Sequence, residues 1–138
     1  MRQVIHNGEV FAVIVTPDDF QPGIKFVSPE HWPFQLGLMM HPQGHVIEPH
    51  HHREHEKRRV TGTQEFLVVI SGKMEVDFYD GAGRLIHSEV VMPGEALLQV
   101  KGGHGFRFPE STRVLEVKQG PYLGRDKDKI PIDAANQT

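Results

Sequence analysis

A cluster of histidines is the feature of this sequence best suited to chemistry. His50, His51, His52 and His55 fall within six positions, and His104 stands alone between glycines about fifty residues later. On a β-strand His50 and His52 would share a face, because alternate side chains point the same way. Two imidazoles can bind one cation at roughly 2.0–2.1 Å, but further ligands are needed to complete its coordination sphere. His104 could be one of these, so the sequence predicts a metal site between the two stretches.

The residue types limit what such a site could do. Neutral imidazoles with one carboxylate suit Mn, Fe, Ni, Cu or Zn without discriminating among them. A metal with an open position could polarise a carbonyl or hydroxyl of a substrate, or activate water or dioxygen. The chain has no cysteine, which excludes disulfides, thiolate metal sites and cysteine nucleophiles. It also has no Gly-x-Ser-x-Gly or kinase-like pattern, so nucleophilic and phosphoryl-transfer mechanisms have no support.

Charge and hydropathy limit the partners. A net charge of −3 and a pI near 6.3 argue against a nucleic acid or an anionic membrane as partner. The first eight residues lack the apolar core of a signal peptide, and no later segment is long and apolar enough to span a bilayer. We therefore expect a cytoplasmic protein that binds a small molecule, with neither nucleic acid nor membrane as partner.

Short strands separated by turns must position these histidines. Alternating or continuous apolar runs, bounded by glycine, proline and aspartate, predict strands over residues 10–15, 24–27, 34–40, 45–52, 65–70, 74–79, 84–92, 96–100, 101–108 and 113–118. The Asp80-Gly81 turn predicts a hairpin between two of them. Many short strands without a long helix indicate an all-β barrel or a double-sheet jelly roll.

The chain divides into three parts on this interpretation. Residues 1–33 form an N-terminal arm that lies along the core or along a partner subunit. Residues 34–119 form the barrel, and residues 120–138 form a polar C-terminal tail.

Glycines at set distances from the histidines resemble the first motif of the cupin superfamily. That motif is a glycine, five residues, His-x-His, three or four residues, a glutamate, six residues and a glycine. Here Gly44 precedes His50 and His52 at the expected spacing, and Glu65 precedes Gly72 at the expected spacing. The two halves are separated by an insertion of about eight residues in the 53–64 segment.

The second cupin motif is matched more loosely. Gly94, Gly102 and His104 resemble its skeleton, but Val100 replaces the proline and Phe108 stands in place of the asparagine. The spacing from Gly94 to His104 is also one residue short. The resemblance covers roughly residues 34–119.

The resemblance implies a double-stranded β-helix, that is, a jelly-roll barrel with a metal in its open mouth. The implied ligands are His50, His52, Glu65 and His104. Glu65 keeps the spacing to Gly72, whereas Glu56 keeps the spacing from His52. Glu56 and His55 therefore stay open as substitutes for Glu65.

Three functions are compatible with this resemblance. The first is a metal-dependent isomerase, epimerase or oxygenase acting on a small polar metabolite. A variant of this first function needs no metal. The run from Phe66 to Val76 resembles cupin-type sugar-nucleotide isomerases and epimerases, which use barrel histidines as acid and base. The second is a non-catalytic module that binds a small molecule or a metal, and the third is a structural or storage protein. Because cupins often exchange N-terminal strands, the resemblance also implies a homodimer formed through residues 4–27.

Overall fold

A computed structural model describes residues 1–52, 62–119 and 129–132. The described chain is all-β, as expected, with three antiparallel sheets and one short 3-10 helix. In chain order the elements are β1 (Arg2–His6), β2 (Glu9–Val15), η1 (Pro17–Asp19), β3 (Gly23–Phe26), β4 (Gly37–Met40), β5 (Glu65–Ser71), β6 (Met74–Tyr79), β7 (Leu85–Val91), β8 (Ala96–Gln99), β9 (Gly103–Arg107) and β10 (Arg113–Lys118). In these residues no helix is long and apolar enough to cross a membrane.

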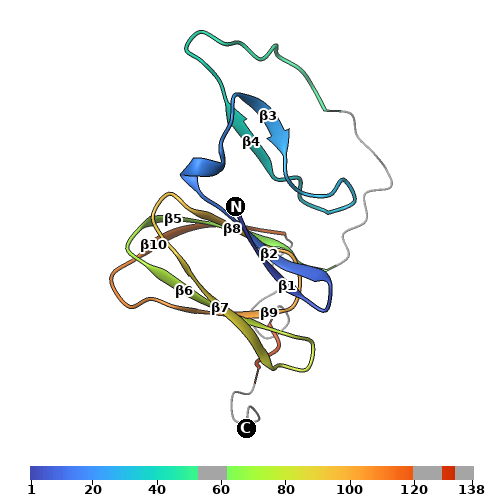
Figure 1. The fold of residues 1–138 in the computed structure, drawn as a ribbon, viewed down its shortest axis with the longest axis vertical. Coiled ribbons are helices and arrows are strands. Elements are labelled where there is room, and N and C mark those ends of the chain that lie inside the picture. Colours follow the sequence, from blue (N-terminus) through green and yellow to red (C-terminus); the bar gives the residue numbers. More distant parts are fainter. Residues whose placement is uncertain (53–61, 120–128, 133–138) are drawn as a thin grey trace.

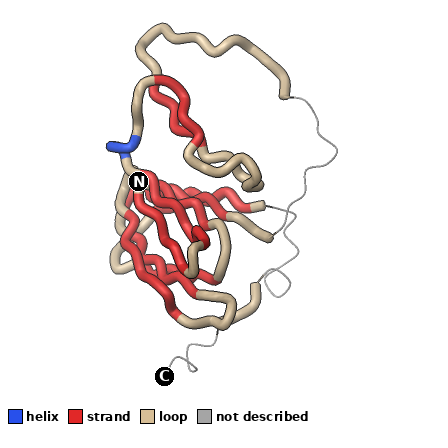
Figure 2. Tube along the Cα trace, turned by 45° about the vertical axis from the view of Figure 1, so that its right-hand side comes forward, coloured by secondary structure: helices blue, strands red, loops and turns tan. Residues whose placement is uncertain are grey.

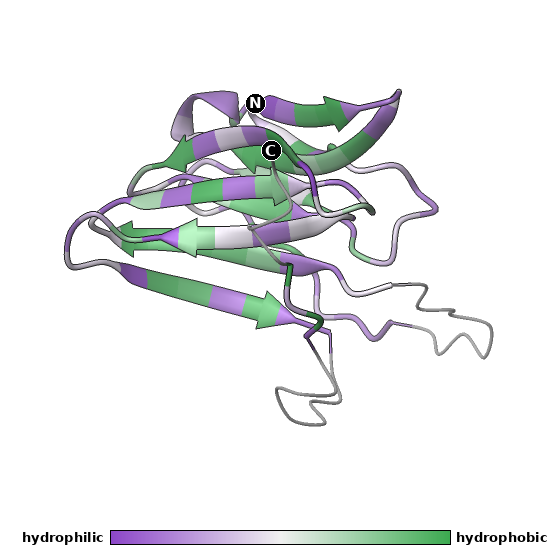
Figure 3. Cartoon of the chain, turned by 90° about the horizontal axis from the view of Figure 1, so that it is seen from below, coloured by the Kyte–Doolittle hydropathy of each residue, from purple (hydrophilic) through white to green (hydrophobic). Residues whose placement is uncertain are grey.

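Two of the sheets lie face to face (Figure 1). One has the strand order β1-β2-β8-β5-β10 and the other β7-β6-β9. Hydrophobic and hydrophilic residues alternate along their strands (Figure 3), which gives each strand an inner and an outer side. The inner faces share a core of large apolar side chains, among them Ile14, Leu67, Met74, Phe78 and Leu97.

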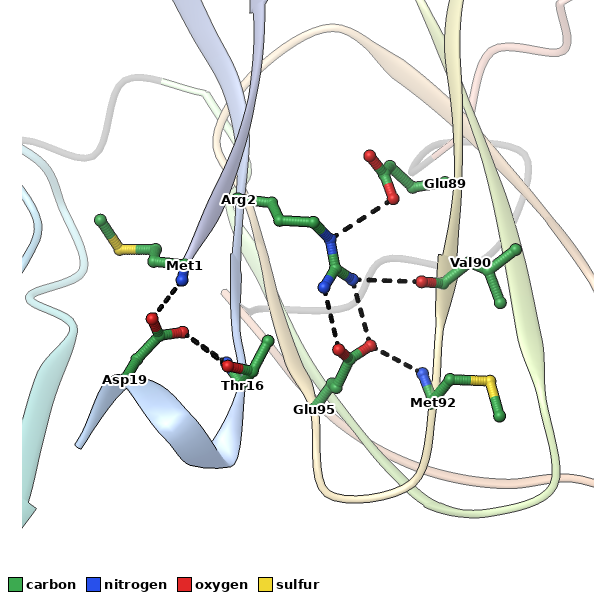
Figure 4. A network of polar contacts seen from close by, with 8 residues as sticks. All are labelled: Met1, Arg2, Thr16, Asp19, Glu89, Val90, Met92 and Glu95. Atoms are coloured by element: carbon green, nitrogen blue, oxygen red, sulfur yellow. Dashed lines mark hydrogen bonds and ion pairs between the residues drawn. The ribbon is translucent and has the colours of Figure 1, made fainter.

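The two sheets form a sandwich. Of the two architectures predicted from the sequence, the described strands do not close into a barrel, and the jelly-roll topology stays a prediction. Within the described ranges no strand of the five-stranded sheet is a hydrogen-bonded neighbour of a strand in the three-stranded sheet. Instead, the side chain of Arg2 connects the two sheets along one open side of the sandwich. Arg2, on edge strand β1, pairs with Glu95 at 2.9 Å and donates to the backbone oxygen of Val90 in edge strand β7 (Figure 4).

A second apolar cluster lies on the outer face of the five-stranded sheet. Val13, Val15 and Leu98 point outward there and pack against residues 27–38, including Trp32 and Leu38. The hairpin of β3 and β4 continues from this cover and forms a separate two-stranded sheet, which contacts the larger sheet through Leu38 of β4 (Figures 1 and 2). All four residues of β3 are exposed.

The prediction of a strand over residues 45–52 is wrong. The described chain has no strand between Met40 and Glu65. Pro42 and Pro49 remove backbone donors from this stretch, and Gly44 has a φ of 84°, which interrupts extended backbone. The expected strand over 34–40 is shortened to β4.

The N-terminal residues add strands to the larger sheet. The strand β1 was not expected, and it pairs with β2 across a turn at Asn7-Gly8. The strand β2 pairs with β8 and is buried from Phe11 to Val15. Residues 1–15 therefore form two of the five strands of the larger sheet.

Candidate functional site

Glu65 is a buried carboxylate on the inner face of the larger sheet. It opens β5, in which Leu67 and Val69 point into the shared core, so the two-residue period turns Glu65 inward as well. Only 8% of Glu65 is exposed. Its strand partners are Gln99 in β8 and Lys118 in β10.

His104 reaches the same place from the opposing sheet. It pairs with Phe78 in the last but one position of the β6–β9 ladder, and both side chains face inward. Its Nε2–H donates to Glu65 Oε2 at 3.0 Å, which joins the two sheets by a hydrogen bond. The His104 side chain keeps 22% of its surface exposed, so the pair lies at an end of the interior that solvent reaches.

The glycines before His104 let β9 approach its neighbours closely. Gly102 has a φ of 78°, and a Cβ there would lie 2.4 Å from the Phe11 ring. A Cβ on Gly103 would lie 2.3 Å from the Ile132 side chain. These two positions explain why the sequence places glycine directly ahead of the histidine.

The surroundings of Glu65 keep its carboxylate ionised. The hydrogen bond from His104 lowers the pKa of Glu65, and the charges of His104, Lys118 and Lys129 lower it further, against the opposing effect of burial. An ionised carboxylate on Nε2–H holds the imidazole in one orientation and one tautomer. A carboxylate–imidazole pair of this kind is suited to proton transfer.

Gln99 belongs to this site although the sequence did not single it out. It lies beside Glu65 in the β5–β8 ladder, is only 2% exposed, and donates from Nε2 to the backbone oxygen of Lys101 at 2.6 Å. Its Oε1, like His104 Nδ1, is buried without a hydrogen-bond partner among the described residues. The sequence signal was a glutamine at the end of the otherwise apolar strand 96–99, which is informative once the inner face of that strand is known.

The other two predicted ligands lie elsewhere. His50 and His52 are exposed residues of the segment after β4, with ring centroids 5.0 Å apart. His50 Nδ1–H donates to the backbone oxygen of Glu48 at 2.8 Å. The alternatives Glu56 and His55 lie outside the described residues.

The four predicted ligands therefore form two pairs, His50 with His52 and Glu65 with His104. Across residues 1–52, 62–119 and 129–132 no three histidine, aspartate or glutamate side chains gather so that they could hold a metal. The donor types suit a transition metal, but the described arrangement does not assemble a ligand set. The four-ligand site stays a prediction.

An apolar pocket of about 340 Å³ lies on the other side of the larger sheet. Phe66 and Leu98 line it, and these side chains point away from Glu65 and Gln99, their neighbours in the same strands. This pocket is therefore separate from the Glu65–His104 pair.

Comparison with known proteins gives no match: no protein-family model, no curated protein and no solved structure is similar to this chain.

Proposed function

We propose that Glu65 and His104 form the acid–base centre of an enzyme that isomerises or epimerises a small polar metabolite. One observation carries this proposal: a buried carboxylate and a partly exposed imidazole, on opposing sheets, are hydrogen-bonded at 3.0 Å. Histidine suits proton transfer near neutral pH because its ordinary pKa lies close to 7. The resemblance of residues 66–76 to sugar-nucleotide isomerases and epimerases favours a nucleotide-linked keto sugar as substrate.

In the proposed reaction His104 first removes a proton from the carbon next to the substrate carbonyl. The C–H bond breaks, and its electron pair moves to the carbonyl oxygen to give an enolate. Glu65 stabilises the imidazolium that forms, because its carboxylate is ionised and hydrogen-bonded to the ring. Protonation of that carbon on its other face by a water molecule gives an epimer, and the imidazolium then loses its proton to solvent. Return of the proton to the former carbonyl carbon gives an isomer, while the proton of the adjacent hydroxyl moves to the former carbonyl oxygen and the adjacent carbon becomes the new carbonyl.

The proposed family is the cupins and the proposed fold their jelly roll. The spacing of Gly44, Glu65, Gly72 and Gly94 supports this assignment, as does the opposition of two antiparallel sheets. The Glu65–His104 contact adds support, because the two residues come from the two separate motifs and meet in space.

The test is deuterium exchange into nucleotide-linked keto sugars in D₂O, followed by NMR. The wild-type protein should incorporate deuterium next to the carbonyl. His104→Gln should lower the rate by about 10²–10⁴, the usual contribution of a general base. Exchange that survives in His104→Gln, or wild-type protein that exchanges none of these sugars, would contradict the proposal. Glu110→Gln, a change at an exposed residue outside the site, is the matched control.

A metal-dependent reaction is the second candidate, favoured by the two close pairs of donors at His50–His52 and Glu65–His104. No step of the reaction above passes through a metal, because the described residues do not gather three donors. Elemental analysis of protein purified without an affinity tag tests this candidate. Near-stoichiometric metal that is lost in the His50→Ala/His52→Ala double variant would support it, whether for an isomerase, an epimerase or an oxygenase. A non-catalytic module that binds a small molecule would show binding without exchange.

The proposed assembly is a homodimer. The β3–β4 hairpin leaves Ile24, Phe26 and Met39 half or more exposed, and a two-stranded hairpin has little stability without a covering partner. Light scattering after size exclusion should give twice the chain mass of 15.6 kDa. Phe26→Ser should shift the protein towards the monomer, whereas a wild-type mass near 15.6 kDa would contradict the proposal.

A further inference from the structure

Two buried hydrogen-bond acceptors beside Glu65 have no donor. Gln99 Nε2 donates to the Lys101 backbone oxygen, so the orientation of the amide is set and Oε1 is the atom left over. His104 Nε2–H donates to Glu65, so in the neutral ring Nδ1 carries no proton and is an acceptor too. Both atoms are buried without a partner in the described part of the chain. A buried acceptor without a donor is destabilising, so a ligand that supplies a donor binds favourably here.

These groups lie together at one end of the interior. Gln99 and Glu65 are direct partners in the β5–β8 ladder and both point inward. Side chains of such partners start about 4.5–5.5 Å apart at Cβ. His104 comes from the facing sheet and contacts Glu65. The end of the sandwich therefore presents a carboxylate, an amide oxygen and a ring nitrogen, all of which accept hydrogen bonds.

The chemistry of this lining selects its ligand. A ligand must supply donors, and the two common kinds are hydroxyl groups and ammonium groups. The Glu65 carboxylate is already paired with His104 and lies near the positive charges of Lys118 and Lys129, so the site has no unbalanced negative charge for a cation, and a neutral hydroxyl is the better donor. We infer that the part of the ligand held here is neutral and polyhydroxylated, such as the sugar ring of the proposed substrate. Its hydroxyl groups donate to Gln99 Oε1, and His104 Nδ1 faces the carbon that loses its proton. The inference rests on the proposed function, and it makes Gln99 a specificity-determining residue of that site.

Three probes that share a six-membered carbon ring test the inference. They are myo-inositol, which is neutral and rich in hydroxyls, cyclohexylammonium and cyclohexanecarboxylate. Each is titrated into protein labelled with ¹⁵N, and the Gln99 side-chain amide signal is followed together with the backbone signals of Glu65 and His104. The expected result is that myo-inositol shifts these signals and binds at least about tenfold more tightly than the other two probes.

Gln99→Met is the decisive variant because it keeps the length of the side chain and removes the acceptor. It should weaken myo-inositol binding about tenfold, the effect of losing about one hydrogen bond. Gln64→Met is the matched control. Gln64 is also a buried glutamine, only 4% exposed, but its Oε1 already accepts from the Phe34 backbone N–H. That change should leave binding unchanged, and the Gln99 amide shift in wild-type protein gives an answer even where a variant fails to fold.

The outcomes separate this inference from the proposed function. If myo-inositol binds at Glu65 and His104 and Gln99→Met leaves this binding unchanged, the inference is overturned, because Gln99 Oε1 then accepts only from a water molecule. The proposed acid–base site is not affected by that result. Tighter binding of cyclohexylammonium would overturn the ligand class. If no probe shifts these signals, the inference fails, and the deuterium exchange of keto sugars still decides the proposed function by itself.

Discussion

At the scale of single residues, the contact between Glu65 and His104 affects stability as well as chemistry. The hydrogen bond from His104 depresses the pKa of Glu65 in the folded protein. A group with a depressed folded pKa stabilises the fold above its unfolded pKa, and this contribution is lost as the pH falls through the folded pKa. The ordinary value for this carboxyl is 4.5, so the effect is complete near neutral pH and disappears in acid.

Glu65→Gln should therefore lower the free energy of unfolding at neutral pH. Below about pH 4.5 the difference in unfolding free energy between this variant and the wild type should become smaller. Urea denaturation at a series of pH values measures both effects. Glu110→Gln should show no such convergence, because Glu110 is exposed and belongs to no ion pair among the described contacts. A gap between Glu65→Gln and wild type that stays constant across the whole pH range would contradict this assignment.

The residues of the site differ in how far sequence could reveal them. Glu65 and His104 were predicted because each lies in a motif with set spacing to glycines. His50 and His52 were predicted through the same motif, but the strand that was expected to carry them contains Pro49 and follows directly on Gly44, which has a positive φ. Gln99 was missed because a glutamine in an apolar strand is informative only once the inner face of that strand is known. Whether Gln99 Oε1 and His104 Nδ1 have hydrogen-bond donors depends on contacts between the two sheets, and no local sequence pattern predicts such contacts.

At the scale of elements, Arg2 fastens edge strand β1 to the opposing sheet. Its guanidinium forms two hydrogen bonds with the Glu95 carboxylate, at 2.9 and 3.1 Å, and donates to the Val90 backbone oxygen (Figure 4). The same contact with Arg2 lowers the pKa of Glu95, ahead of the bond from the Met92 backbone N–H. A paired fork of this kind has better geometry than an isolated surface ion pair.

Arg2→Met should lower the free energy of unfolding by about 1 kcal/mol, a modest figure because the arginine is partly exposed. Hydrogen exchange should also speed up in β1 before it does in β5 or β6. Lys101→Met is the control, since the ion pair of Lys101 with Glu9 is more exposed and should contribute only a few tenths of a kcal/mol. Equal losses in the two variants would show that Arg2 does not fasten the strand.

The elements themselves were largely predictable. The alternation of Met74, Val76 and Phe78 marked β6 with its observed bounds, and turns such as Asp80-Gly81 separated the later strands. The strand β1 was missed although Asn7-Gly8 is a strong hairpin turn, and both residues have the positive φ that such turns need. What sequence could not specify was the closure of the sheets, because closure depends on hydrogen bonds between edge strands far apart in the chain.

At the scale of the whole molecule, residues 129–132 return from the C-terminal part of the chain to the end of the sandwich that holds the site. The Ile132 side chain packs on Gly103, next to His104, and on Gly83 in the β6–β7 turn. Lys129 is close enough for its charge to act on Glu65. Both glycines matter here, because a Cβ at either position would lie within 3.2 Å of Ile132.

This packing predicts that Ile132 holds residues 129–132, and with them Lys129, against the outer side of β9. Gly103 and Tyr79 are partners in the β6–β9 ladder, and the alternation that turns Phe78 and His104 inward turns these two outward. Ile132→Ala should therefore raise the pKa of Glu65 towards its ordinary value, because the charge of Lys129 that lowers this pKa is no longer held in place. An NMR titration of the side-chain carboxyl carbons measures the shift. Ile130→Ala is the matched control, since that side chain is 93% exposed and covers little. Equal pKa values of Glu65 in wild type and Ile132→Ala would contradict this role of Ile132.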